Sequence, residues 1–129
     1  MAIIGVDHVV IRVKDLEEAI ERYRAIGLEL SNTTENPAVG KVAIFRLADG
    51  FFLELVAPLS PESPIGRALE TRGEGVHSIA LAVDDLEATV GDLETRGAPI
   101  IRGEGLPLAF IHPKATPGAM LQIMERTKS

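Results

Sequence analysis

The chain of 129 residues contains no cysteine. This absence excludes disulfide bonds, thiolate metal ligands and a cysteine nucleophile, and it is typical of a protein in a reducing compartment. No apolar run approaches the about 20 residues that a membrane-spanning helix needs, and the N-terminus has no charged region followed by a long apolar one. We therefore expect a cytoplasmic protein with no membrane partner.

Clusters of basic residues are also missing. Lys and Arg number 13 against 19 Asp and Glu, which gives a formal net charge of -6 at pH 7. Nucleic acid is not an expected partner, because phosphate binding needs a clustered basic surface. The hydrophobic content of 46% with charges of both signs indicates an ordered globule. The length fits one compact domain, or two half-size modules that share a core.

What the sequence does contain is an internal repeat. The stretch from Asp7 to Ala19 returns in weaker form from His77 to Thr89, an offset of 70 residues. In both copies an alternating apolar run meets Asp-Leu-Glu, and a helical pattern follows. A second echo relates residues 51–56 to residues 119–124 at an offset of 68. The chain is therefore interpreted as two related halves.

The patterns in each half predict one β-α-β-β-β module. The expected strands are residues 3–13, 28–33, 42–47, 51–56, 75–83, 98–102, 106–111 and 120–125, and the expected helices are residues 15–26, 64–72 and 85–96. Asp15 and Asp85 are natural N-caps, and residues 34–37 are expected to form a loop.

The resulting fold class is α+β, with two tandem modules related by pseudo-twofold symmetry and enclosing a cleft. The modules are residues 1–58 and 75–129, and residues 59–74 form a linker with a short helix. We expect this single domain to form a homodimer through sheet edges or helices.

The two modules differ at positions that could carry chemistry. One has His8 and Glu54 where the other has Ser78 and Gln122. Glu54 lies in mid-strand with apolar neighbours, so its carboxylate must be paired, ligated or protonated. If the modules fold inward, these four side chains meet in a cleft with Phe52, Met120 and Met124 as apolar surroundings. A few converging polar groups in apolar walls are typical of a small-molecule site.

Several stretches resemble one known superfamily. They are Asp7-His8-Val9, Glu54 to Ser60, Ser63 to Gly75, Asp84-Asp85-Leu86 and Phe110 to Lys114. Together with the two-module plan, they resemble the vicinal oxygen chelate superfamily, which includes glyoxalase I, extradiol dioxygenases, bleomycin-resistance proteins and methylmalonyl-CoA epimerase. The likeness is nearest to the epimerase and covers nearly the whole chain.

The resemblance implies a divalent metal, Co, Mn, Ni or Zn, held by His8, Glu54 and Gln122. Ser78 stands where metal-binding relatives have His, and Gln122 stands where they usually have Glu. A neutral hydroxyl and a neutral amide are weaker ligands than the groups they replace. The epimerases also carry a carboxylate near the third strand, where this chain has Ala38 and Ala43.

These observations support one main function and two alternatives. The main hypothesis is an isomerase or lyase of the glyoxalase or epimerase type with a degenerate metal site. In it a metal polarises the carbonyl of a small carbonyl or acyl-thioester compound, and Glu54 and His8 are the catalytic residues. The residues expected to contact the substrate are Arg12, Phe52, Ser78, Lys114, Met120 and Gln122. The first alternative is a metal-free binding protein of the resistance type. The second is metal-independent chemistry that uses only His8 and Glu54.

Overall fold

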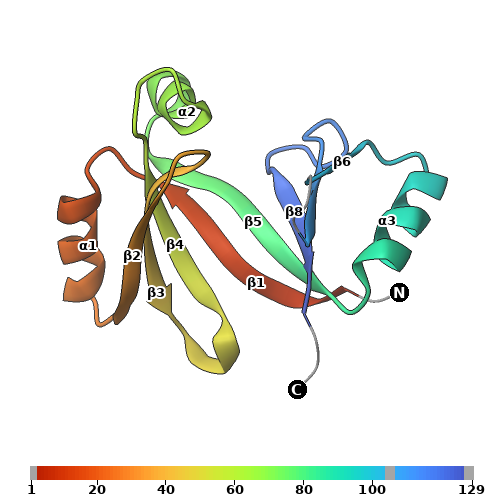
Figure 1. Ribbon diagram of the computed structural model, residues 1–129, viewed down its shortest axis with the longest axis horizontal. Coiled ribbons are helices and arrows are strands. Elements are labelled where there is room, and N and C mark those ends of the chain that lie inside the picture. Colours follow the sequence, from red (N-terminus) through yellow and green to blue (C-terminus); the bar gives the residue numbers. More distant parts are fainter. Residues whose placement is uncertain (1–2, 104–106, 127–129) are drawn as a thin grey trace. The chain divides into compact units, whose positions relative to one another are not determined.

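The computed structural model describes residues 3–103 and 107–126 (Figure 1). This part of the chain forms eight strands, three α-helices and one 3₁₀ helix. It divides into two compact units, one made of residues 8–77 and the other of residues 3–7 with residues 78–126. No helix among the described residues is long and apolar enough to cross a membrane.

The predicted order of strands and helices is confirmed. Along the chain the first elements are β1 (Ile3–Arg12), α1 (Leu16–Ala25), β2 (Leu30–Asn36), β3 (Gly40–Arg46), η1 (Ala48–Gly50), β4 (Phe52–Ala57) and α2 (Pro64–Arg72). The remaining elements are β5 (Gly75–Val83), α3 (Leu86–Thr95), β6 (Ile100–Arg102), β7 (Leu108–Ile111) and β8 (Leu121–Glu125). Leu106, the expected start of the seventh strand, lies outside the described residues.

In the 8–77 unit the strand order is β2-β3-β4-β1, and β1 runs parallel to β4. Helix α1 covers one face of this sheet (Figure 1). It begins where the Asp15 carboxylate accepts a hydrogen bond from the Glu18 amide at 3.1 Å, which satisfies a free N–H of its first turn. The buried residues of this layer are Val13, Ala19, Ala43, Phe45, Leu55 and Ala57.

The opposite face of the same sheet is partly covered by α2. Val10, Val42 and Val56 project from three strands and pack with Ile65 of this helix. Ser63 caps α2 by accepting a hydrogen bond from the Gly66 amide, and Pro64 occupies the first helical turn, as the sequence predicts. The two sheet faces therefore differ, because one is covered along its length by α1 and the other carries α2 at the Arg12 end.

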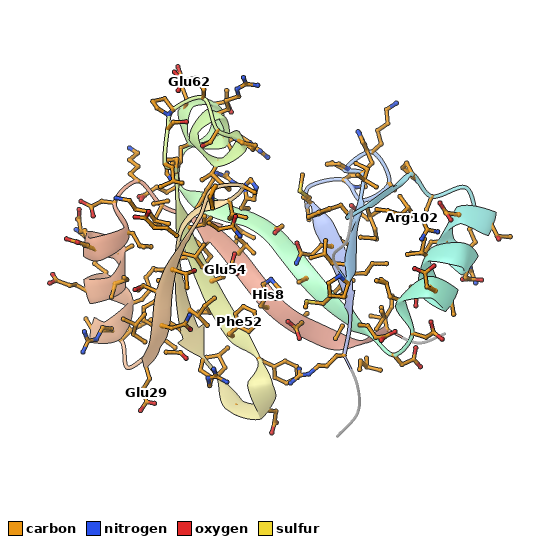
Figure 2. The ribbon with its side chains drawn as sticks, in the orientation of Figure 1. His8, Glu29, Phe52, Glu54, Glu62 and Arg102 are labelled. Carbon is orange, nitrogen blue, oxygen red and sulfur yellow. The ribbon has the colours of Figure 1, made fainter. Side chains whose placement is uncertain are left out.

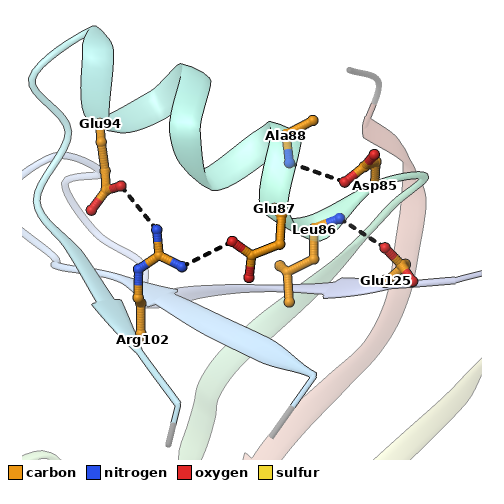
Figure 3. Close-up of polar contacts among 7 residues, drawn as sticks. All are labelled: Asp85, Leu86, Glu87, Ala88, Glu94, Arg102 and Glu125. Carbon is orange, nitrogen blue, oxygen red and sulfur yellow. Dashed lines mark hydrogen bonds and ion pairs between the residues drawn. The ribbon is translucent and has the colours of Figure 1, made fainter.

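The second unit repeats this plan. Its strand order is β5-β8-β7-β6, with β5 parallel to β8, and α3 packs on it over a core of Val83, Val90, Ala109, Ile111 and Ile123. Figure 3 shows Asp85 capping α3 through the Ala88 amide and Arg102 pairing with Glu87 and Glu94.

The register of the strands confirms the internal repeat. Val10 lies opposite Glu54 in the parallel pair of the first unit, and Ala80 lies opposite Gln122 in the second. These partners are related by the same offsets, 70 and 68 residues, that the sequence shows. Equivalent residues therefore occupy equivalent places in the two sheets.

Strand β2 is longer than predicted. It continues to Asn36, although residues 34–37 were expected to form a loop. Asn36 pairs with Gly40 of β3, and its side chain accepts a hydrogen bond from the Ala38 amide, which tightens the turn. The polar residues of this segment favour a loop by composition, but cross-strand pairing at the sheet edge extends the strand.

Candidate functional site

Glu54 occupies an apolar position in the middle of a sheet. It pairs with Val10 on one side and Ile44 on the other, while Phe52 and Val56 share its face along β4. Burial raises the pKa of the Glu54 carboxyl, and the nearby charge of His8 acts in the opposite direction. The apolar setting predicted from the sequence is therefore confirmed, and it favours the neutral form of this acid.

His8 lies on the same face as Glu54. Its ring stacks on Phe52 with centroids 4.3 Å apart and an angle of 10° between the rings, and the residue is only 6% exposed. His8 and Phe52 lie opposite each other in the register of β1 and β4. Figure 2 shows Glu54, His8 and Phe52 gathered in this region. An imidazole held in one orientation beside a half-buried carboxyl can accept, donate or relay a proton.

Arg12 is buried, with 5% of its surface exposed, and its guanidinium is occupied. Its Nε donates to the Gly73 carbonyl at 2.8 Å, and a terminal nitrogen donates to the Val76 carbonyl at 3.0 Å. Burial lowers the pKa of Arg12, and the charge of Arg72 adds to this effect. Arg12 thus hydrogen-bonds to the backbone at the end of α2 and the start of β5. Its contact with substrate stays a prediction.

His77 is a neighbour of Arg12. Its Nδ1 lies 3.5 Å from an Arg12 guanidinium nitrogen. Burial lowers the pKa of His77, and the charges of Arg12 and Arg72 lower it further. The residue is therefore kept neutral beside a fixed cation.

The remaining predicted site residues belong to the other unit. Ser78 on β5 is 4% exposed, and Gln122 on β8 is 8% exposed and lies between Ala80 and Phe110 in the strand register. Met120 precedes β8, and its carbonyl accepts a hydrogen bond from the Ile79 amide. Lys114 is exposed in the turn that follows β7. The prediction that these residues share a cleft with His8 and Glu54 stays a prediction.

Among the described strands of the 8–77 unit, Glu54 is the single carboxylate on its face. Strand β3 contributes Val42 and Ile44 beside it, since these residues pair with Val56 and Glu54. Ala43 projects to the other face and is fully buried against α1. Strand β3 therefore places no carboxylate next to Glu54, which belongs to β4.

The donor set does not fit a tightly held divalent metal. Among residues 3–103 and 107–126, no group of three or more His, Cys, Asp or Glu side chains is arranged to hold an ion. A neutral amide adds little affinity to a histidine and one carboxylate.

Arg46 was not singled out from the sequence, yet it stands on the Glu54 face. It pairs with Phe52 across β3 and β4. The signal was present in the alternation of Val42, Ile44 and Arg46 along one strand. The alternation alone does not show which arginine of this face is occupied and which is accessible.

A groove on the α1 side of the same sheet contains neither His8 nor Glu54. Its lining includes Lys14 and Lys41 together with Asp15, Glu17 and Glu35. This mixture of charges has no strong preference for an anion or a cation. We therefore place the candidate site by its chemistry, at Glu54 and His8.

Comparison with known proteins identifies the family. A family model for the Glyoxalase/Bleomycin resistance protein/Dioxygenase superfamily matches residues 7–109. The chain belongs to this superfamily. A relative within it, the ethylmalonyl-CoA/methylmalonyl-CoA epimerase of Cereibacter sphaeroides, is 34% identical over 126 residues, which cover 91% of this chain and 94% of the relative.

Solved structures in the superfamily agree with this relationship. The methylmalonyl-CoA epimerase of Mycobacterium tuberculosis has a TM-score of 0.84 and 32% identity, covering 98% of this chain and 90% of that one. A variant of the Streptomyces coelicolor methylmalonyl-CoA epimerase, in complex with 2-nitronate-propionyl-CoA, also has a TM-score of 0.84, with 28% identity over 98% of this chain and 100% of that one. The chain is thus a methylmalonyl-CoA epimerase-like member of the superfamily.

Proposed function

We propose that this protein moves a proton at the carbon next to the carbonyl group of an acyl-CoA thioester, as an epimerase does, and that Glu54 is the proton acceptor. The relatives named for methylmalonyl-CoA epimerase activity support the substrate class. The position of Glu54 supports the role of the base. Methylmalonyl-CoA is the first substrate to test.

The environment of Glu54 is the observation that carries this proposal. A hydrogen next to a thioester carbonyl is weakly acidic, so it is removed faster by a stronger base. An ordinary glutamate is a weak base at neutral pH. Burial between Val10 and Ile44 raises the pKa of Glu54, and this brings the carboxylate closer to the basicity that proton transfer requires.

The proposed step involves the side chains, the substrate and water. A Glu54 carboxylate oxygen takes the proton, and the electron pair of the broken C–H bond forms the C=C bond of an enolate whose charge resides on the thioester oxygen. Delivery of a solvent proton to the opposite face of this enolate inverts the configuration, and Glu54 releases the proton that it took to solvent. We propose that His8 assists through its charge and hydrogen bonding, and that Ser78 and Gln122 provide hydrogen bonds to the bound ligand.

Deuterium exchange tests the role of Glu54. The protein is incubated with methylmalonyl-CoA in deuterium oxide, and the mass of the recovered thioester is followed over time. The wild type is expected to incorporate one deuterium, and Glu54→Gln should slow this exchange about 100-fold to 10,000-fold, the usual contribution of a positioned base.

Glu29→Gln is the matched control for this experiment. Glu29 is an exposed carboxylate just before β2, at the end of that strand and away from Glu54 (Figure 2). This variant should exchange deuterium at the wild-type rate. Undiminished exchange by Glu54→Gln would remove Glu54 from the mechanism.

One observation favours a second function, the binding of a small molecule without turnover. Val42 and Ile44 leave Glu54 without a second carboxylate on its face. A site of this kind can bind a ligand through one acid and an apolar floor. A wild-type protein that binds methylmalonyl-CoA but incorporates no deuterium would support this binding function over the enzyme.

A further inference from the structure

Arg46 is an accessible cation on the Glu54 face. Its Nε and one terminal nitrogen donate to the Ser31 hydroxyl at 3.4 and 3.3 Å. Both distances are at the long end for hydrogen bonds, and the acceptor is neutral. Within the described part of the chain, the Arg46 guanidinium has no ion pair. Its charge is therefore available to a ligand at a small cost in lost contacts.

The other basic side chains of this face are buried. Arg12 donates to the Gly73 and Val76 carbonyls and is 5% exposed. His8 is 6% exposed and stacked on Phe52. Arg46 is exposed. It is the guanidinium of this face that can reorient without breaking a buried network.

The strand register places Arg46 within reach of a substrate at Glu54. Ile44 is the direct partner of Glu54, and Arg46 lies two residues further along β3, opposite Phe52. Diagonal neighbours of this kind are roughly 7–8 Å apart, a distance that a long side chain can span. A group bound over Glu54 can therefore contact the Arg46 guanidinium when it turns from Ser31 toward β4.

The chemistry of a malonyl-type thioester calls for such a cation. Its free carboxylate is attached to the same carbon that loses the proton, so an ionised Glu54 and this carboxylate repel each other at close range. The apolar floor of Val10, Ile44 and Phe52 does not screen that repulsion. A guanidinium can relieve it through a bidentate pair with the substrate carboxylate.

We propose that Arg46 binds the free carboxylate of the acyl group and so selects 2-carboxyacyl thioesters over thioesters with an uncharged acyl group. This inference rests on the proposed function, because it assumes an acyl thioester at Glu54. We assign this role to Arg46 and not to Arg12, because the Arg12 guanidinium donates to the backbone carbonyls of Gly73 and Val76.

Binding of two thioesters tests the inference. Malonyl-CoA and propionyl-CoA share the CoA portion but differ in the terminal carboxylate, and their affinities are measured by isothermal titration calorimetry. The wild type should bind malonyl-CoA about tenfold or more tightly than propionyl-CoA. Arg46→Gln should abolish this preference by weakening malonyl-CoA alone, and Arg46→Lys should retain part of it because the charge remains.

Arg22→Gln is the matched control, because Arg22 is an exposed arginine on α1, which covers the opposite face of the sheet. The preference of the Arg22→Gln variant for malonyl-CoA should equal that of the wild type. Melting curves should show that all variants are folded. An unchanged preference in Arg46→Gln would overturn the inference while leaving the proposed function intact. A wild type that binds neither thioester and exchanges no deuterium would overturn both.

Discussion

Glu54→Gln should stabilise the protein at neutral pH as well as impair proton transfer. The substitution keeps the shape of the side chain and removes its ability to ionise. The carboxyl lies among Val10, Ile44, Phe52 and Val56, where the ionised form is poorly solvated. The position is therefore unfavourable for the folded state whenever Glu54 carries its charge.

The raised pKa of Glu54 determines the sign and the pH range of this effect. Below the ordinary value of 4.5 the carboxyl is protonated in both the folded and the unfolded chain. As the pH rises above that value, the unfolded chain ionises first, so the free energy of unfolding of the wild type falls until the raised folded pKa is passed.

The size of the loss follows from the same linkage. It amounts to about 1.4 kcal/mol for each unit by which the pKa is raised. The His8 charge opposes burial but is the smaller of the two causes, and we therefore expect a net gain in the free energy of unfolding for Glu54→Gln at neutral pH.

Urea denaturation between about pH 4 and pH 8 measures this difference. The free energies of unfolding of the wild type and of Glu54→Gln should be closest at the acidic end and should separate as the pH rises. Glu29→Gln, at an exposed carboxylate, should follow the wild type throughout. A Glu54→Gln protein that is less stable at neutral pH, or a difference that does not change with pH, would refute the reasoning.

Three further predictions concern the two units. Ser78→His should raise the affinity for Co, Mn, Ni or Zn, because it places an imidazole at the position where metal-binding relatives have His. Calorimetry measures this affinity, and the absence of any gain would contradict the predicted arrangement of the metal ligands. Asp15→Ala and Asp85→Ala should each lower the free energy of unfolding by about 1 kcal/mol in urea denaturation, because each carboxylate caps a helix; an unchanged midpoint would show that the cap contributes nothing. Leu55→Ala should cost about 2–5 kcal/mol, because Leu55 is fully buried in the α1 layer, and a loss well below this range would indicate that the core collapses around the missing atoms.

Local patterns in the sequence determined the secondary structure of each unit. Asp15 and Asp85 predicted the helix starts, because an N-cap acts on amide groups only a few residues away. The repeat predicted equivalent strands, and the alternation along residues 51–56 placed Glu54 among apolar neighbours on its own strand. The exception was the end of β2, where pairing of Asn36 with Gly40 outweighed a composition typical of loops.

The tertiary structure decided which arginine of the Glu54 face is buried and which is exposed. Alternation alone does not distinguish Arg12 from Arg46, since each shares one face of its strand with mostly apolar residues. Arg12 is 61 residues from Gly73 along the chain, and only the return of the backbone after α2 brings those carbonyl groups to its guanidinium. Alternation fixes the face of a side chain, whereas the partners beside it depend on which distant strands pair and in what register.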